Sequence, residues 1–398
     1  MKDIKVLNIL SKTAFFIFVV LVVYFVYYGL ANSIQGIFEG DSIIFHIPIA
    51  QQLAKFTFMP ADLTMGLGYL PATAEAILSV FILLHLPLNL FNVLGLICLF
   101  IAAKKVAESF GLSKEMSIIY AVGLSTLQSV LRWPLTQVSD IWLAVFFLAV
   151  LYLLKVPKKN NKYFLSLGFF TGMLVGAKSS GLIFAALLLV FFGINVFKKI
   201  KVSKIIFFAV PLLLFGFSWY IRNYILTGNP MYPVGIFTLA GDPEYLNLAA
   251  GNWSIFANTL QNPAYIIKVA NALISEFFVW ASALVLPVYV LAKKRVGKDL
   301  KKLSIVAIVI FLAFIFTFPA ESVVSNMRHI YPLMAIVILQ AFMLFEKKQE
   351  EVAIFATLSC IFPLMNLGYH PKILILALIP AFYFIFINTR LFDKVKEA

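Results

Sequence analysis

The 398-residue chain is poor in charge, because only 13% of its residues are Asp, Glu, Lys or Arg, whereas 62% are hydrophobic. Soluble globular domains carry about 25% charged residues. This shortage of charge therefore excludes a soluble protein. Together with a mean hydropathy of +0.97, it indicates an all-α polytopic membrane protein.

Cysteine is also scarce. The chain has two, Cys98 and Cys360, and both lie within apolar stretches, so they supply no disulfide framework. No Cys/His spacing typical of a zinc site, no internal repeat and no low-complexity tract occurs in the sequence. We expect no separate soluble domain at either end, and therefore a single membrane domain over residues 1–398.

Apolar segments predict about 12 membrane spans. They lie near residues 14–30, 88–103, 116–133, 140–154, 163–177, 180–197, 205–221, 276–292, 303–319, 330–345, 352–367 and 372–388. The first span ends in aromatic residues, among them Tyr27 and Tyr28. This is typical of an interfacial anchor, so we expect the segment to be retained rather than cleaved as a signal peptide.

The net charge of +14 would suit nucleic acid in a soluble protein. Here, however, most Lys and Arg residues lie in alternate short loops, such as 155–162, 198–204 and 293–302. By the positive-inside rule, these loops and both termini face the cytoplasm. We therefore predict a multi-pass protein of the cell membrane, with membrane lipids as neighbours and no nucleic-acid partner.

Two longer segments, 31–86 and 223–275, then form outer loops. The apolar stretch 72–86 is ambiguous, but a crossing there would move Lys104 and Lys105 to the outer side. We therefore interpret 72–86 as a helix that lies in the outer interface, so that the first outer loop consists of amphipathic pieces.

Isolated charges distinguish the outer side from the basic inner side. The first outer loop contains Glu39, Asp41, His46 and Glu75. Ionisable groups at a membrane boundary are functional candidates by default. Taken alone, however, Asp41 would also serve as a helix N-cap, and His46 as an ordinary surface histidine.

Four further outer charges lie at span ends: Asp140, Lys178, Arg222 and Arg328. Singly, each cation suits an interfacial anchor that extends to water. Together, three cations on the same side as an acidic loop favour a phosphate-binding site, since Lys and Arg bind phosphate through charge-assisted hydrogen bonds. A carboxylate beside that phosphate could accept a proton from a nucleophile.

These pieces resemble the GT-C glycosyltransferases, in the branch of the protein mannosyltransferases and the lipid A aminoarabinose transferase. The resemblance begins with Gly40-Asp41-Ser42-Ile43-Ile44-Phe45-His46-Ile47-Pro48 and covers most of residues 1–335. The later pieces follow in the family's order: Tyr69-Leu70-Pro71 with Glu75, Ser139-Asp140, Gly176-Ala177-Lys178 with Gly181, Arg222-Asn223-Tyr224 with Thr227-Gly228-Asn229-Pro230, and Arg328 before Tyr331-Pro332. Ser42 stands where the family often has a second acid, and the soluble C-terminal domain of larger members has no counterpart here.

The resemblance implies a GT-C-like fold and transfer of a monosaccharide from a polyprenyl-phosphate donor to an acceptor hydroxyl on the outer face, with inversion. It implies Asp41 as the general base, with Glu39 as the rival. We expect the substrate to be bound by Glu39, His46, Glu75, Asp140, Lys178, Arg222 and Arg328. Arg222 has an alternative role, which is to pin the loop 223–233. No cofactor is required, although a divalent cation such as Mg²⁺ or Mn²⁺, held by Asp41 with Asp140 and Glu75, stays an open alternative.

Two other classes of protein fit the composition. A secondary transporter or lipid flippase has a similar number of spans, but it typically shows two-fold internal repetition and charges at mid-membrane. A non-catalytic scaffold would not need three outer cations beside an acidic loop. The sequence names neither the sugar nor the acceptor, whether lipid, glycan or protein.

Overall fold

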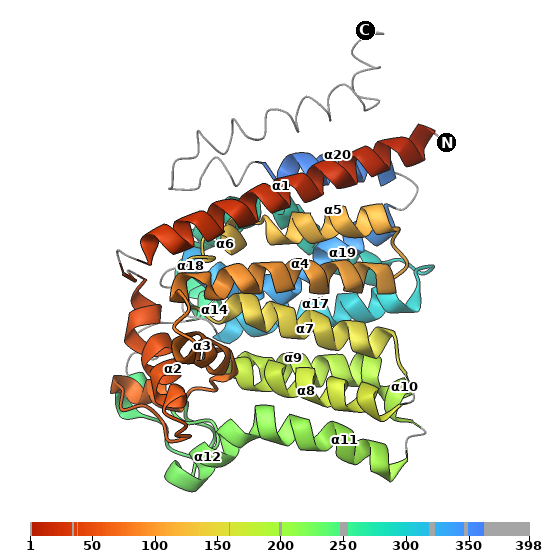
Figure 1. Cartoon of the computed structure of the whole chain (residues 1–398). Coiled ribbons are helices and arrows are strands. Elements are labelled where there is room, and N and C mark those ends of the chain that lie inside the picture. The colour runs from red at the N-terminus through yellow and green to blue at the C-terminus, as the bar shows by residue number, and fades with distance from the viewer. Residues whose placement is uncertain are drawn as a thin grey trace.

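The computed structural model describes residues 2–33, 36–37, 39–158, 160–198, 201–246, 254–317, 323–345 and 349–361. Within these ranges the chain forms helices and no strand, and the long helices lie side by side as a bundle (Figure 1). The expected span 372–388 and the end of the span 352–367 lie outside the described residues.

Helices are labelled α, and 3₁₀ or π segments η. The first half contains α1 (Lys2–Asn32), η1 (Ser42–His46), α2 (Ile47–Ala54), η2 (Thr64–Tyr69), α3 (Thr73–Leu83), η3 (Leu88–Leu90), α4 (Phe91–Ser109), α5 (Lys114–Ser125), α6 (Gln128–Leu131), α7 (Asp140–Lys155), α8 (Asn161–Ala177) and α9 (Ser179–Leu188). The second half contains η4 (Leu189–Gly193), α10 (Ile194–Phe197), α11 (Val202–Leu212), η5 (Leu213–Phe217), α12 (Ser218–Thr227), α14 (Ile255–Gln261), α15 (Tyr265–Phe277), η6 (Phe278–Val285), α16 (Leu286–Ala292), α17 (Lys298–Thr317), α18 (Val323–Asn326), η7 (Met327–Ile330), α19 (Tyr331–Leu344) and α20 (Gln349–Ser359).

Seven segments of the described chain are long and apolar enough to cross a membrane. They are Lys5–Asn32, Leu88–Ser109, Ser179–Phe197, Val202–Thr227, Tyr265–Ala292, Lys298–Thr317 and Val323–Leu344. The expected spans 116–133, 140–154 and 163–177 correspond to α5, α7 and α8, which have 12, 16 and 17 residues and are shorter than a typical span. The chain is therefore a helical membrane protein, but the count of about 12 crossings is not confirmed.

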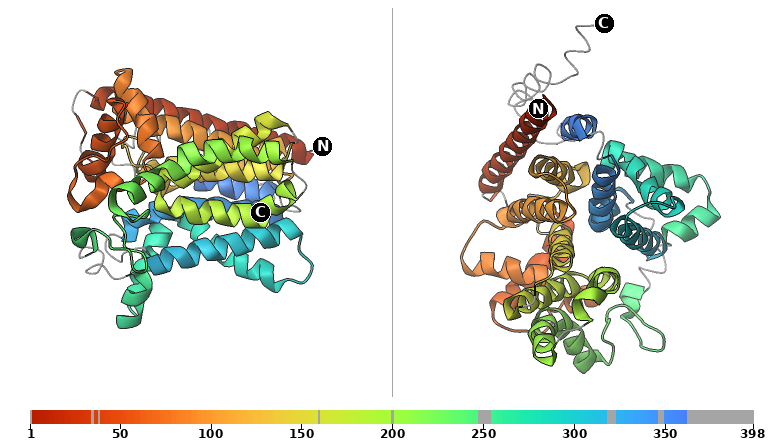
Figure 2. Two further views of the ribbon diagram at one scale, coloured as in Figure 1. Left: turned by 90° about the horizontal axis from the view of Figure 1, so that it is seen from below. Right: turned by 90° about the vertical axis from the view of Figure 1, so that its right-hand side faces the viewer.

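The core of the bundle surrounds α19, which packs against α5, α7 and α17. Its residues are buried from Tyr331 to Phe342, and Tyr120 on α5 donates a hydrogen bond to the Ala335 carbonyl at 2.8 Å. By contrast, α11 and α12 lie at the edge of the bundle (Figure 2) and expose Ile206 and Ile225. Such apolar surfaces suit contact with lipid, because a helix satisfies its own backbone groups.

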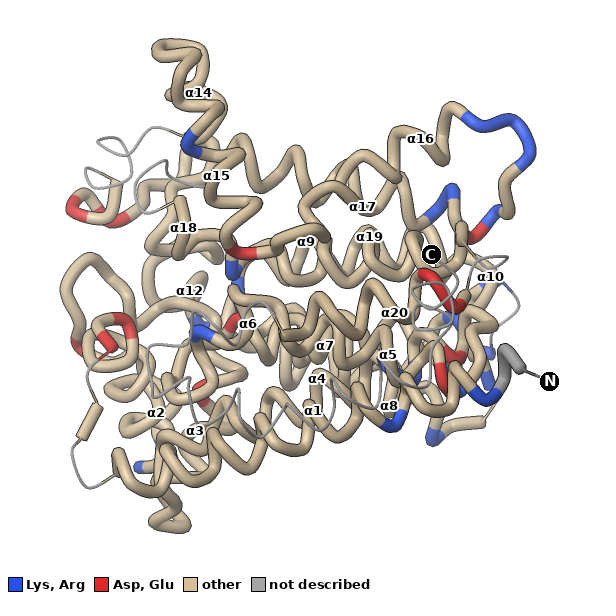
Figure 3. Tube along the Cα trace, turned by 90° about the horizontal axis from the view of Figure 1, so that it is seen from above, with Lys and Arg blue, Asp and Glu red and all other residues tan. Residues whose placement is uncertain are grey.

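The two ends of the bundle differ. Lys and Arg gather at the end that holds the N-terminus and the α16–α17 loop (Figure 3). At the opposite end, α2 and α3 pack together, and α6, α12 and α18 lie near them (Figure 1). The 11-residue α3 occupies the ambiguous stretch 72–86, and it is too short to cross a bilayer.

Candidate active site

The acidic motif that contains Glu39 and Asp41 starts the π segment η1. The Glu39 carboxylate accepts hydrogen bonds from the backbone N–H of Asp41 at 3.1 Å and of Ser42 at 2.6 Å. Glu39 therefore caps the segment, whereas the Asp41 side chain makes no capping hydrogen bond. This division of roles leaves the Asp41 carboxylate available for other contacts.

Ser42 joins this motif to the segment before α7. Its side chain is fully buried, and its Oγ accepts the Gln137 backbone N–H at 3.0 Å. Gln137 in turn donates from Nε2 to the Leu88 carbonyl at 3.1 Å and to Asn89 Oδ1 at 3.2 Å. Because Gln137 lies three residues before Asp140, this link brings the two acidic segments together.

His46 and Glu75 bind each other. His46 Nδ1 lies 2.5 Å from Glu75 Oε1, and both side chains are buried. The pair joins η1 to α3. Glu75 Oε2 has no hydrogen-bond partner among the described residues. Neither residue makes an ion pair with Asp41, Asp140 or the outer cations in the described chain, so this pair is separate from the cluster below.

Lys178 is the single extended residue between α8 and α9, with φ −166° and ψ 153°. Gly176 and Gly181, which flank Lys178, explain how closely this turn packs against its neighbours. A Cβ on Gly176 would collide with Thr73 Oγ1 and the Phe215 carbonyl, and one on Gly181 would collide with the Leu174 carbonyl. Glycine at these positions therefore lets the turn pack closely against α3 and η5, which fixes where the lysine begins.

Asp140, at the start of α7, is the centre of a charged cluster that also contains Asp41, Lys178, Arg328 and His329. Asp140 Oδ1 lies 2.7 Å from Lys178 Nζ and 2.9 Å from His329 Nδ1, and Oδ2 lies 3.4 Å from Arg328 Nε. The terminal nitrogen of Arg328 donates to Asp41 Oδ2. Two carboxylates thus balance two cations, and Arg328 bridges both carboxylates.

Burial differs strongly within the charged cluster. The Asp140 side chain is 2% exposed and that of Arg328 is 12% exposed, whereas that of Asp41 is 36% exposed. Burial lowers the pKa of Lys178, and the neighbouring Asp140 carboxylate opposes that shift. Asp41 is therefore the carboxylate of the cluster that faces open space.

The sequence interpretation did not identify His329 or Trp133. The His329 imidazole lies 2.9 Å from Lys178 Nζ, and it accepts this hydrogen bond or donates to Asp140, depending on its tautomer. The Trp133 ring centroid lies 4.9 Å from the Arg328 guanidinium carbon, a cation–π contact. His329 directly follows Arg328 in the sequence, and that adjacency was the available signal.

Arg222, the third cation of the predicted phosphate site, has its own set of partners in the structure. Its guanidinium donates to Asn223 Oδ1 at 3.0 and 3.1 Å and to the Tyr69 carbonyl at 3.1 Å. It also lies over the rings of Phe58 and Trp219, at 5.3 and 5.2 Å. No hydrogen bond or ion pair connects it with the charged cluster in the described chain. Arg222 therefore ties α12 to the backbone of η2, and it reaches the loop after α12 only through Asn223, whose Nδ2 donates to the Tyr232 carbonyl at 3.1 Å.

The charged cluster does not fit a divalent cation as it stands. In the described chain, no three His, Cys, Asp or Glu side chains gather as a metal site. The Arg328 guanidinium contacts both Asp41 and Asp140, where a bridging metal ion would bind, and Glu75 is paired with His46.

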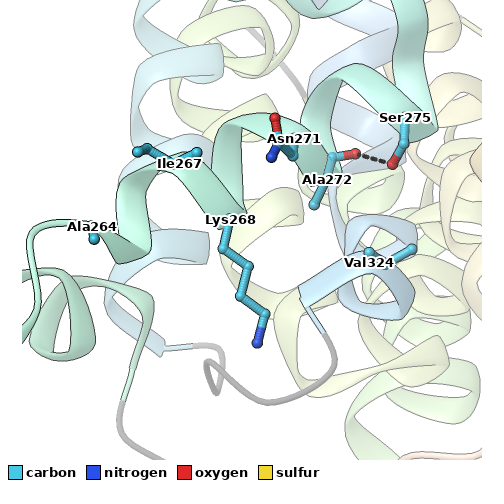
Figure 4. A pocket seen from close by; sticks show the side chains of 7 residues that line it. All are labelled: Ala264, Ile267, Lys268, Asn271, Ala272, Ser275 and Val324. Carbon is cyan, nitrogen blue, oxygen red and sulfur yellow. Dashed lines mark hydrogen bonds between the residues drawn. The ribbon is translucent and has the colours of Figure 1, made fainter.

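Lys268, on α15, makes no ion pair with these residues in the described chain, and Figure 4 shows its side chain. It lines an open groove of about 540 Å³ between α15 and Val324, with Ile267, Asn271 and Ser275. Its Nζ lies 5.5 Å from the Tyr265 ring centroid. No described carboxylate pairs with it, and its setting is that of an interfacial lysine.

A family model with the description "Domain of unknown function (DUF8201)" matches residues 2–347. The chain belongs to the DUF8201 family. A comparison of this DUF8201 chain with curated proteins found no match.

Solved structures reveal the fold of the DUF8201 chain. ArnT from Cupriavidus metallidurans bound to undecaprenyl phosphate is similar with a TM-score of 0.54 and 14% identity, over 84% of this chain and 62% of that chain. Apo ArnT gives a TM-score of 0.51 with 14% identity, over 87% and 65% of the two chains. The Archaeoglobus fulgidus oligosaccharyltransferase, in complex with zinc and sulfate, gives a TM-score of 0.50 with 14% identity, over 91% and 53%.

Both neighbours are GT-C glycosyltransferases, so the DUF8201 chain has a GT-C-like fold. It spans less than two thirds of the length of each of these structures.

Proposed function

We propose that this DUF8201 protein is a membrane glycosyltransferase that uses a polyprenyl-phosphate monosaccharide as donor. The observation that carries the proposal is the charged cluster: a partly exposed carboxylate, Asp41, lies beside two cations at one end of a GT-C-like bundle. Similarity to ArnT, whose structure holds undecaprenyl phosphate, supports this class of donor.

The chemistry needs few groups. The oxygen of an acceptor hydroxyl attacks the anomeric carbon, and the bond from that carbon to the phosphate oxygen breaks. The polyprenyl phosphate leaves with the bonding electrons, and Asp41 accepts the hydroxyl proton. Arg328 and Lys178 stabilise the negative charge that develops on the leaving phosphate. Attack from the face opposite the phosphate inverts the anomeric carbon.

The remaining candidates take supporting roles in this proposal. Glu39 is committed to two backbone N–H groups, which favours Asp41 as the base. His46 and Glu75 fix η1 against α3, and Arg222 holds α12 against the end of η2. The basic residues at the opposite end of the bundle favour a reaction on the outer face, with the N-terminus in the cytoplasm (Figure 3).

The test is transfer by the full chain in lipid nanodiscs, with a panel of radiolabelled polyprenyl-phosphate monosaccharides and envelope extract as the acceptor source. We expect Asp41→Asn to lower turnover by about 10²- to 10⁴-fold, because the amide keeps the shape but accepts no proton. Glu39→Gln, whose single amide oxygen can keep one of the two backbone hydrogen bonds to η1, is the matched control and should retain most activity. Equal turnover of the wild type and Asp41→Asn at saturating donor and acceptor would refute the assignment of the base.

A further inference from the structure

Asp140 is fully occupied by the protein itself. Its side chain is 2% exposed, Oδ1 contacts Lys178 and His329, and Oδ2 contacts Arg328. A substrate could reach this carboxylate only by breaking a buried ion pair, which is costly. Asp140 therefore acts through the two cations and does not contact the substrate.

Arg328 is held on three sides, and the three contacts differ in how easily they break. Asp140 contacts Nε from the buried side, and the Trp133 ring lies 4.9 Å from the guanidinium carbon. The third contact is Asp41, whose side chain is 36% exposed and stands at the first turn after the outer-loop segment. An exposed ion pair contributes little net stability, so the Asp41 contact is the exchangeable one.

From this arrangement, and resting on the proposed function, we infer that the donor phosphate replaces Asp41 as the partner of Arg328. Asp140 and Trp133 are the positioning residues that keep the guanidinium in place during the exchange. A phosphodiester carries one negative charge, as the Asp41 carboxylate does, so the exchange preserves the charge balance of the cluster. Asp41 is released to act as base only after the donor has bound.

Two consequences follow. An Asp41 carboxylate that no longer accepts a hydrogen bond from Arg328 is available to accept the hydroxyl proton, so donor binding itself frees the base. Asp41 also competes with the phosphate for Arg328. Removal of its charge should therefore tighten phosphate binding while abolishing turnover. A carboxylate that bound the donor, directly or through a metal ion, would have the opposite effect on affinity.

The experiment measures the affinity of undecaprenyl phosphate for the full chain in nanodiscs. Asp41→Asn should bind this probe about threefold to tenfold more tightly than the wild type. In the variant the probe no longer has to break the partly exposed ion pair between Asp41 and Arg328. Asp41→Ser, which also removes the charge, is the second variant. Glu108→Gln is the matched control, because it neutralises a carboxylate paired with Lys104 and Lys105 near the other end of α4, and its affinity should equal that of the wild type.

The positioning residues have their own readout. Asp140→Asn should lower turnover about tenfold or more, because it removes the carboxylate that positions Arg328 and Lys178, even though the loss of a negative charge by itself favours binding of an anionic probe. Trp133→Leu should weaken binding, and Trp133→Phe, which keeps an aromatic face, should restore most of it.

Two outcomes would overturn the inference. If the wild type binds the probe and both Asp41 variants bind it equally or more weakly, the exchange is wrong while the donor assignment stands. If the wild type shows no binding, both the donor class and the exchange fail.

Discussion

Arg328 and Arg222 invite comparison because the sequence assigns them the same role. Both are largely buried, both lie towards the same end of the bundle, and each carries an aromatic ring against its guanidinium. Their polar partners differ. Arg328 contacts two carboxylates, one of them partly exposed, whereas Arg222 donates to backbone carbonyls and to the neighbouring Asn223.

The comparison teaches that an arginine is free to bind a ligand only if one of its partners can leave. The Gly68 and Tyr69 carbonyls belong to the backbone around η2, so they cannot turn away from the guanidinium as a side chain can. The Asp41 carboxylate can return to water, since its side chain is 36% exposed. Both arginines carry the same charge, so only their polar partners distinguish the one that can bind a ligand from the one that cannot.

The largest expected effect is on Arg328. Truncation to Ala should lower kcat/KM roughly 30- to 900-fold, which corresponds to a loss of about 2–4 kcal/mol of transition-state stabilisation. The reason is that the leaving phosphate loses its main hydrogen-bond donor. Arg328→Lys should rescue only part of this loss, since the forked geometry is gone. Lys178→Ala should have the next largest effect. Steady-state kinetics with donor varied at fixed acceptor would check this, and a change within twofold for Arg328→Ala would contradict it.

The second prediction concerns Arg222, whose loss should affect folding more than chemistry. Arg222→Ala removes the guanidinium donor of the Gly68 carbonyl and one of the two donors of the Tyr69 carbonyl, so we expect the free energy of unfolding to fall by about 2–3 kcal/mol. Activity per folded molecule should change much less than for Arg328→Ala. Thermal unfolding in detergent, paired with the transfer assay on the folded fraction, separates these effects. If Arg222→Ala keeps its melting temperature but loses donor affinity, Arg222 binds the donor as Arg328 does. The distinction between the two arginines would then be wrong.

The smallest effect is expected for Lys268, which faces the open groove of Figure 4. Lys268→Ala should change donor affinity and turnover by no more than about 0.5 kcal/mol, because surface substitutions away from buried networks rarely do more. The same assays apply. If Lys268→Ala lowers donor affinity and turnover as much as Arg328→Ala does, the three cations are general membrane anchors. The assignment of Arg328 and Lys178 to the donor phosphate would then be wrong.

Several residues of the candidate site could be predicted from the sequence, because the local sequence indicates on which side of the membrane a residue lies. Hydropathy and the loop charges place Asp41, Asp140, Lys178 and Arg328 at outer span ends, and the structure brings these four together. Their pairing could not be predicted, since it depends on how η7 packs against α6 and α7.

The partners of Arg222 and the number of membrane spans could not be predicted from the sequence. Arg222 meets the Tyr69 carbonyl across 153 residues, and no local pattern reports that contact. The His46–Glu75 pair, 29 residues apart, is equally hidden. Hydropathy also detects an apolar segment at 116–133 but not the end of α5 at Ser125, where Thr126 and Leu127 separate it from α6.

The balance of charge in the cluster affects how a donor arrives. Two carboxylates beside two cations produce little field at a distance, so long-range electrostatic steering contributes little to encounter. A polyprenyl tail instead confines the phosphate to the membrane plane, where its effective concentration near the bundle is high. Capture would thus be two-dimensional, its rate nearly independent of ionic strength, and a water-soluble phosphate without a tail would compete poorly.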